Sequence, residues 1–367
     1  MNKKKILLVS NGFYPEISPR SFRATELAKE FARQGHQVTV YSKYRDFDYS
    51  DFLKKYNINF TMWGRDRFSK VPIFKGKIGN IVNRAASRIL QILFEYPAIE
   101  DMFKVRNLLK SESGYDLIIS FAVPFPVHWG VASARTKTHP IAIRWIADCG
   151  DPYMGNTNDT FGKAFYFRYM EKFFCSKADV ITVPKIEMKV NYYPEFHEKI
   201  REIPQGFDID EMKIEKSYVN NDVPTFAFAG AFIKKYRDPE FLLSYLSRIK
   251  DDFRFVIYTR NTEFIQPIRH NLKNKLIVRD YVPREQLLHE LSKMDFLLNI
   301  AYDPATQAPS KLIDYAIAGR PILSIPSGKF DTDLIDQFLK GDYTNRLNIG
   351  SIERYNIKNV SKLFFEV

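Results

Sequence analysis

Cysteine is scarce in this sequence, and long apolar runs are missing. The two cysteines, Cys149 and Cys175, cannot build a disulfide framework and do not have the spacing of metal ligands. The apolar run at residues 6–9 is far shorter than a membrane span or the core of a secretory signal. These absences argue against a disulfide-stabilised secreted domain, and we expect a cytoplasmic protein.

Acidic residues are also in deficit, because 43 Asp and Glu stand against 55 Lys and Arg, a formal net charge of +12. The excess is concentrated in residues 53–110, where twelve basic residues accompany four acidic ones and are interleaved with aromatic and aliphatic side chains. Such a segment is most often a solvated helix face, and it also suits an anionic membrane surface. In that second case, residues 54–110 would hold the protein peripherally on the inner face of the plasma membrane. Net charge alone supports nucleic acid only weakly, and we expect no nucleic-acid partner.

Two parts of the chain begin with the same strand, loop and helix pattern. Residues 4–10 form an apolar, β-branched run, and Ser21 is a candidate cap for the helix that follows. The pattern returns at residues 225–229, with Gly230 in the next turn. This order predicts an α/β fold with two Rossmann-like domains, whose ligands bind at the carboxyl ends of the strands. Gly12 lies at the first such end, although the G-x-G-x-x-G spacing of dinucleotide sites is missing.

The chain has enough apolar material for two cores, since 45% of its 367 residues are hydrophobic. We expect the first domain to span residues 1–208 and the second to span residues 222–345. The polar stretch between them is predicted to be a linker.

The stretch from Ala305 to Gly328, ATQAPSKLIDYAIAGRPILSIPSG, joins a polar loop, a short helix and a buried strand. Lys311 and Asp314 lie near the start of this helix, and Gly319 ends it. Backbone N–H groups at a helix start favour an anion, and Lys311 adds a full positive charge there. The carboxylate of Asp314 is placed to accept hydrogen bonds from ribose hydroxyls. The residues predict a nucleoside diphosphate site, with an ordinary α/β unit as the alternative.

The segment PSKLIDYAIAGRPIL also resembles the donor-binding segment of retaining glycosyltransferases of family 4, in which a Lys precedes EYLAAGRPIL. The resemblance implies that Asp314 binds the ribose of the donor, with Ser310 and Lys311 at the same site. Asp314 replaces the usual Glu of the family. Thr306 occupies the position of the partner Glu eight residues upstream.

Two segments of the first domain resemble the same family. GHQVTV at residues 35–40 matches the family's GHxVxV, and the preceding loop holds Ser18, Arg20 and Arg23 where the family has paired glycines and an Arg-bearing helix. The segment from Phe121 onward resembles the family's GPPHSxHLIGLxLAK followed by PWIADFRDPW. The resemblance implies that His128 faces a cleft between the domains and touches the transferred sugar or the acceptor.

The second domain adds two matching loops. Lys235 and Arg237 follow its first strand, where the family carries a basic pair that grips the donor diphosphate and helps the leaving group depart. Tyr281 and Val282 fall in the family's base-contacting loop. The resemblance further implies a GT-B fold, in which two Rossmann-like domains face each other and the C-terminal segment, residues 346–367, crosses back to the first.

These resemblances imply a glycosyltransferase that moves a sugar from a nucleoside diphosphate sugar to a glycan or lipid-linked acceptor with retention, in cell-envelope polysaccharide synthesis. No cofactor and no metal ion are expected, and the formal D-x-D at residues 46–48 lies in a charged loop that favours a structural role. A non-catalytic scaffold or a sugar-nucleotide epimerase of the same fold is the alternative.

The predicted residues are His128, Arg237 and Lys235 for catalysis; Gly12, Gly230, Tyr281, Val282, Ser310, Lys311 and Asp314 for the donor; and Ser18, Arg20, Arg23 and Asp148 for the acceptor side.

Overall fold

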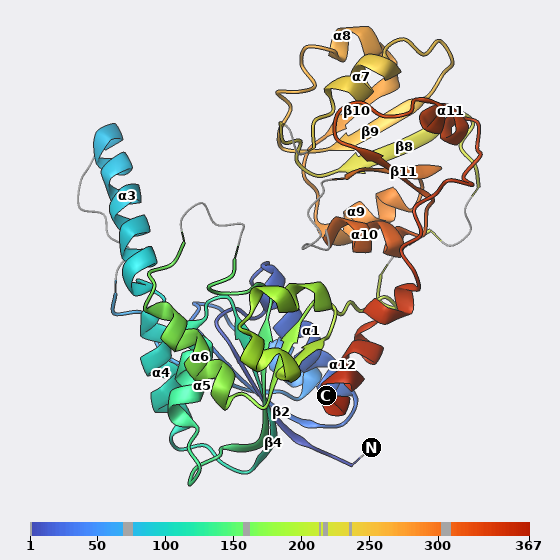
Figure 1. Ribbon diagram of the computed structural model, residues 1–367. Coiled ribbons are helices and arrows are strands. Elements are labelled where there is room, and N and C mark those ends of the chain that lie inside the picture. The colour runs from blue at the N-terminus through green and yellow to red at the C-terminus, as the bar shows by residue number, and fades with distance from the viewer. Residues whose placement is uncertain are drawn as a thin grey trace. The chain divides into compact units, whose positions relative to one another are not determined.

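The computed structural model describes residues 2–68, 76–156, 162–212, 214–215, 219–234, 237–301 and 310–367. The chain divides into two compact units (Figure 1): unit 1 consists of residues 1–207 and 355–367, and unit 2 of residues 208–354. In each unit a parallel sheet is covered by helices on both faces. Residues 346–354, which the sequence analysis assigned to the terminal segment, belong to unit 2.

Unit 1 is built on a seven-stranded parallel sheet in the order β3-β2-β1-β4-β5-β6-β7. The order reverses between β1 and β4, and in such sheets ligands bind beside this switch point at the carboxyl ends of the strands. The strands are β1 (Lys5–Ser10), β2 (Gln37–Ser42), β3 (Asn59–Met62), β4 (Tyr115–Ala122), β5 (Ala142–Cys149), β6 (Val180–Val183) and β7 (Ile200–Glu202).

Helices cover both faces of this sheet and create two cores. Helices α1, α2 and α12 pack on one face, and α4, α5 and α6 pack on the other. Helix α12 returns from the far end of the chain and buries Ile357, Val360 and Phe364 against α1 and the sheet, as the implied fold requires. The helices of unit 1 are α1 (Pro19–Arg33), α2 (Ser50–Tyr56), α3 (Gly76–Phe94), α4 (Ile99–Leu109), α5 (Pro126–Ala134), α6 (Phe167–Lys177) and α12 (Ile357–Glu366), with 3-10 helices η1 (Ile186–Asn191) and η2 (Pro194–Lys199).

Local sequence explains where α1 begins and why residues 186–199 form two short helices. The cap of α1 is Ser18, not Ser21: its side chain accepts a hydrogen bond from the Ser21 N–H at 3.2 Å, and Pro19 supplies a helical φ at the first position. Pro194 has no N–H to donate and cannot continue a helix from η1, so the segment breaks into two 3-10 helices.

Unit 2 repeats the architecture with a five-stranded parallel sheet in the order β10-β9-β8-β11-β12. Helices α7, α8 and α11 pack on one face of this sheet, and α9 and α10 pack on the other. The strands are β8 (Thr225–Ala229), β9 (Arg254–Tyr258), β10 (Leu276–Arg279), β11 (Phe296–Ala301) and β12 (Ile322–Pro326). The helices are α7 (Glu240–Leu246), α8 (Arg269–Leu272), α9 (Arg284–Leu291), α10 (Ser310–Ala318) and α11 (Asp333–Leu339), with 3-10 helices η3 (Lys273–Lys275) and η4 (Ile352–Tyr355).

Candidate functional site

A buried lysine marks the carboxyl edge of the sheet in unit 2. The Nζ atom of Lys311, in the first turn of α10, lies 3.6 Å from the ring centroid of Phe228 and 5.2 Å from that of Tyr315. This Nζ atom is buried and forms no hydrogen bond with any residue of the described ranges. Burial lowers the pKa of Lys311 well below its ordinary value, and the nearby charge of Arg237 lowers it further. Among the described residues, this buried amine therefore has no anionic partner.

Helix α10 and the end of β8 are tied together at this point. The hydroxyl of Tyr315, one turn after Lys311, accepts a hydrogen bond from the Ala229 N–H at 2.9 Å. The next residue, Gly230, has φ = +140°, a conformation that side-chain-bearing residues rarely adopt. The Cδ atom of Lys311 lies 3.9 Å from the position that a Cβ atom on Gly230 would take. The loop after β8 and the lysine of α10 thus lie against each other, as predicted for a donor site.

Arg237 lies at the end of the same loop. Its backbone pairs with Ile233, with N···O distances of 2.7 and 3.2 Å, which closes a tight turn. Its guanidinium forms no ion pair with any described residue. Lys311 lies beside Gly230, and the charge of Arg237 acts on it. Lys235, the side chain of Ser310, and Thr306 lie outside the described residues.

Asp314, the predicted ribose ligand, already has a partner. Arg284, the first residue of α9, donates to its Oδ1 atom from Nε at 2.8 Å and from Nη2 at 2.6 Å. Burial raises the pKa of Asp314, and the positive charge of Arg284 opposes that rise. The side chain of Asp314 remains 20% exposed, so the carboxylate is partly open. Sequence reasoning missed Arg284, although it directly follows the Tyr281-Val282-Pro283 turn.

The predicted base-contacting turn contains one exposed and one packed side chain. Tyr281 is 58% exposed, and the guanidinium of Arg260 lies 4.4 Å from the centroid of its ring. Val282 is partly buried against the core formed with α9 and α10. Arg260 follows β9 and was not among the predicted residues. The Arg260 guanidinium and the Tyr281 ring therefore lie together at the carboxyl edge of the sheet in unit 2.

In unit 1, the residues assigned to the acceptor side form a buried ion cluster. Arg23 donates from Nε and Nη2 to the carboxylate of Asp148 at 2.6–3.0 Å, and Arg20 donates at 2.8 Å. Thr182 adds a hydrogen bond of 3.0 Å, while Arg23 also donates to two backbone carbonyls. A Cβ atom at Gly150 would lie 2.3–2.5 Å from the guanidinium of Arg20, so a side chain there would displace this guanidinium. The hydrogen-bonding capacity of Asp148 and Arg23 is used to join α1 to β5 and β6.

His128 does not face a cleft, contrary to the expectation from sequence. Its ring is 0% exposed, and its two nitrogens lie 2.8 Å from Ser120 Oγ and 3.5 Å from Cys149 Sγ. Trp145 donates to the same Ser120 oxygen at 2.8 Å. Burial lowers the pKa of His128 to about 3. The structure therefore shows a neutral core histidine without an open ring atom for a sugar.

Two other predicted residues of unit 1 have local structural roles. Ser18 caps α1. A Cβ atom at Gly12 would lie 2.0 Å from Ser21 Oγ, so this glycine allows the loop after β1 to approach α1 closely.

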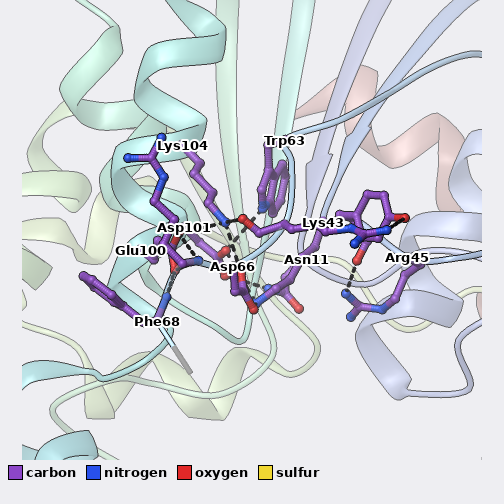
Figure 2. Close-up of polar contacts among 12 residues, drawn as sticks. Asn11, Lys43, Arg45, Trp63, Asp66, Phe68, Glu100, Asp101 and Lys104 are labelled. Atoms are coloured by element: carbon purple, nitrogen blue, oxygen red, sulfur yellow. Dashed lines mark hydrogen bonds and ion pairs between the residues drawn. The ribbon is translucent and has the colours of Figure 1, made fainter. Parts of the chain in front are cut away.

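Sequence reasoning missed a polar cluster at the carboxyl edge of β1, β2 and β3 (Figure 2). Asp101 of α4 is 0% exposed and accepts hydrogen bonds from Asn11 Nδ2 at 2.6 Å and Trp63 Nε1 at 3.2 Å. Lys43 lies 2.7 Å from Asp66 and 3.8 Å from Asp101. Burial raises the pKa of Asp101, and Lys43 counters that rise. These contacts hold the loop after β3 at the edge where Rossmann-like units bind ligands.

The described ranges contain no group of three or more His, Cys, Asp or Glu side chains arranged to hold a metal ion. In the formal D-x-D, Asp48 Oδ1 accepts hydrogen bonds from the N–H and the hydroxyl of Ser50, at 2.9 and 2.6 Å, at the start of α2. Among the helices in these ranges, none is long and apolar enough to cross a membrane.

Comparisons with known proteins give a family match and several similar solved structures. The model of Glycosyltransferase Family 4 matches residues 22–211, more than half of the chain. A comparison with curated proteins found no significant match. Similar solved structures include a glycosyltransferase from Rickettsia africae, with 13% identity, a TM-score of 0.59 and coverage of 100% of this chain and 98% of that one.

Two further structures cover 99% of this chain and 98% of their own. They are HepE of Anabaena in complex with UDP, with 11% identity and a TM-score of 0.59, and sucrose-phosphate synthase of Thermosynechococcus elongatus, with 11% identity and a TM-score of 0.61. At such identities the likeness shows the fold, which is GT-B, as implied by the sequence.

Proposed function

Since the chain belongs to glycosyltransferase family 4, we propose that it transfers a sugar from a nucleoside diphosphate sugar to a glycan or lipid-linked acceptor. Retention of the anomeric configuration is part of this proposal and follows from the resemblance of the α10 segment to retaining members of the family. The proposed setting is cell-envelope polysaccharide synthesis in the cytoplasm.

The observation that carries the proposal is the buried Nζ atom of Lys311 near Gly230, which forms no hydrogen bond with any described residue. Burying an ammonium without an anion is unfavourable, and a bound diphosphate would supply the missing charge. Arg237 adds a second cation, and the first turn of α10 adds backbone N–H groups. HepE was solved with UDP, so uridine nucleotides are among the first donors to test.

The same charges would also act in the reaction. The main barrier to sugar transfer is departure of a nucleoside diphosphate from a centre that becomes oxocarbenium-like. Fixed positive charge at the β-phosphate stabilises the growing negative charge of the leaving group, and losing one such donor costs roughly 10²- to 10³-fold in rate. We assign this role to Arg237 and Lys311, with Lys235 as a third candidate. In this proposal the leaving group needs no metal ion.

A turnover assay tests the proposal. Free nucleoside diphosphate should appear from the matching nucleotide sugar, faster with acceptor present, and with unchanged rate in EDTA. Arg237→Ala should reduce kcat roughly 10²- to 10³-fold. Arg248→Ala, an exposed arginine of unit 2, is the matched control and should keep full activity. Product with an inverted anomeric centre would remove retention from the proposal.

A non-catalytic scaffold is the second candidate, and the pairing of Asp314 with Arg284 favours it. A carboxylate held by an arginine has less capacity for ribose hydroxyls than a free one. Nucleotide binding without turnover, across donors and acceptors, would select the scaffold over the transferase.

A further inference from the structure

Helix α3 is the one long helix of unit 1 whose apolar side chains do not join the described cores. It spans 19 residues and extends beyond the layers of the unit (Figure 1). Its apolar residues recur at three- and four-residue steps through Ile81, Val82, Ala85, Ile89 and Leu93, which aligns them on one face. Ile81 is 68% exposed and Ile89 is 55% exposed. A helix with such a face is normally stabilised by packing, so this face requires a partner.

Aromatic side chains of a distant segment extend this face at the carboxyl end of α3. The Ala164 N–H donates to the Ile92 carbonyl at 3.4 Å, and the Tyr166 hydroxyl donates to the Leu93 carbonyl. These bonds bring Phe165 beside the end of α3, and Tyr169 follows one turn later in α6. Phe165 is 71% exposed, and Tyr169 is 59% exposed. We refer to Ile81, Val82, Ile89, Leu93, Phe165 and Tyr169 together as the α3–α6 surface.

The charged side chains that border the apolar face of α3 are basic. Helix α3 contains no Asp or Glu, and it carries Arg84 and Arg88 one turn apart beside the apolar face. The guanidinium of Arg168 lies 4.8 Å from the ring centroid of Tyr169. An apolar face bordered by arginines and aromatic rings is typical of helices that lie in the interface of an anionic membrane. Pairing two copies through this surface would bring like charges together.

We propose that the α3–α6 surface binds the face of an anionic lipid membrane, with α3 lying in the interface. The apolar and aromatic side chains enter the headgroup region, and Arg84, Arg88 and Arg168 contact lipid phosphates. This role does not depend on turnover, so it stands or falls separately from the proposed transferase activity.

Co-sedimentation with vesicles tests this role. The full chain should bind vesicles of phosphatidylcholine with about 30% phosphatidylglycerol much more strongly than phosphatidylcholine alone, and salt should weaken the binding. The double variant Ile89→Ser/Phe165→Ser should lower the partition coefficient at least ~10-fold, because two apolar side chains are lost from the interface. Arg84→Gln/Arg88→Gln should lower it about fivefold for each charge removed.

Matched controls come from other exposed positions. Ile143 and Val190 are 79% and 75% exposed, and Ile143→Ser/Val190→Ser should bind vesicles like the parent protein, as should Lys250→Gln/Lys340→Gln. Circular dichroism and thermal melting confirm that each variant is folded.

Three results would overturn the proposal. The first is absence of binding to the anionic vesicles, and the second is equal loss of binding in the controls. The third is a dimer, seen by analytical ultracentrifugation without lipid, that Ile89→Ser/Phe165→Ser dissociates; this would show that a second copy covers the surface instead.

Discussion

The amine of Lys311 makes the ligand-free protein sensitive to pH in a particular direction. Its pKa is lowered in the folded state, so between that value and its ordinary value the unfolded state binds more protons. The stability contributed by this group is therefore lost as pH falls and regained as pH rises toward about 10. Lys311→Met removes the titrating amine and puts an apolar side chain of similar length in its place.

We predict that ligand-free Lys311→Met is at least as stable as the parent near neutral pH, and that its advantage shrinks as pH rises. Urea unfolding at pH 7 and pH 10 measures this difference. The exposed Lys340→Met is the control and should show no such trend. A variant clearly less stable than the parent at pH 7 would show that the Lys311 ammonium already has a partner in the empty site.

His128 gives the second prediction at the scale of one residue. Its pKa is lowered to about 3, so below its ordinary value of about 6.5 the unfolded state takes up a proton that the folded state does not. The parent protein should lose about 1.4 kcal/mol of stability per pH unit from this group as pH falls through that window. In His128→Phe that part of the slope should vanish, whereas His270→Phe, at an exposed position, should leave it unchanged.

Denaturant unfolding between pH 6 and pH 4 measures both slopes. The Michaelis constant for the donor should stay near the parent value in His128→Phe. A large change in that constant with unchanged stability would restore the role in substrate contact that the sequence implied.

Sequence patterns located residues that the fold brings together, but they did not show which residues are buried. Lys311 and Gly230 were recognised from their place in loop and helix patterns, and they do come together. His128 and Asp148 were also recognised by pattern, yet both are buried and occupied by neighbours. Sequence order shows which residues follow a strand, whereas exposure depends on side chains that pack from distant segments. Arg284 was missed for the same reason, since its contact with α10 is tertiary.

At the scale of elements, the ion cluster around Asp148 joins α1 to β5 and β6. Replacing a buried acid leaves its arginines without a counter-charge, which typically costs about 3–5 kcal/mol. We predict a loss of this size for Asp148→Asn, measured by urea unfolding. Glu195→Gln, which breaks the exposed pair with Lys172, should cause no measurable change. Equal stability of Asp148→Asn and the parent would show that the cluster does not hold α1 in place.

Some helices and strands were predicted from the sequence, and others were missed. The apolar runs that became β1 and β8 were clear, because parallel strands are buried on both faces. Helix α2 and strand β3 were missed, since their short segments mix polar, basic and aromatic residues and show no clean period. The cap of α1 was placed three residues late because Ser18 and Ser21 are both capping residue types, and only Pro19 discriminates between them.

At the scale of the whole molecule, the end of the chain completes the first unit. Phe364 of α12 is 0% exposed and contacts Phe31 of α1 edge to face, at a ring centroid distance of 6.3 Å. We predict that Phe364→Ala lowers the stability of unit 1 by about 3–5 kcal/mol, because it leaves a cavity in this core. The exposed Lys362→Ala on the same helix is the control. Nucleotide binding by unit 2 should persist in Phe364→Ala, measured below the melting temperature; its loss would contradict the assignment of the nucleotide site to unit 2 alone.

We propose above all that unit 2 holds the diphosphate of a nucleotide sugar at Lys311 and Arg237. Thermal unfolding with UDP, GDP, ADP and dTDP, each free and sugar-linked, tests it most directly. A nucleotide at about 100 times its Kd should add about 2.7 kcal/mol of stability. We predict a rise in Tm with at least one of these nucleotides, lost in Lys311→Met and kept in Lys340→Met. Absence of a shift with every nucleotide, or an equal shift in Lys311→Met, would contradict it.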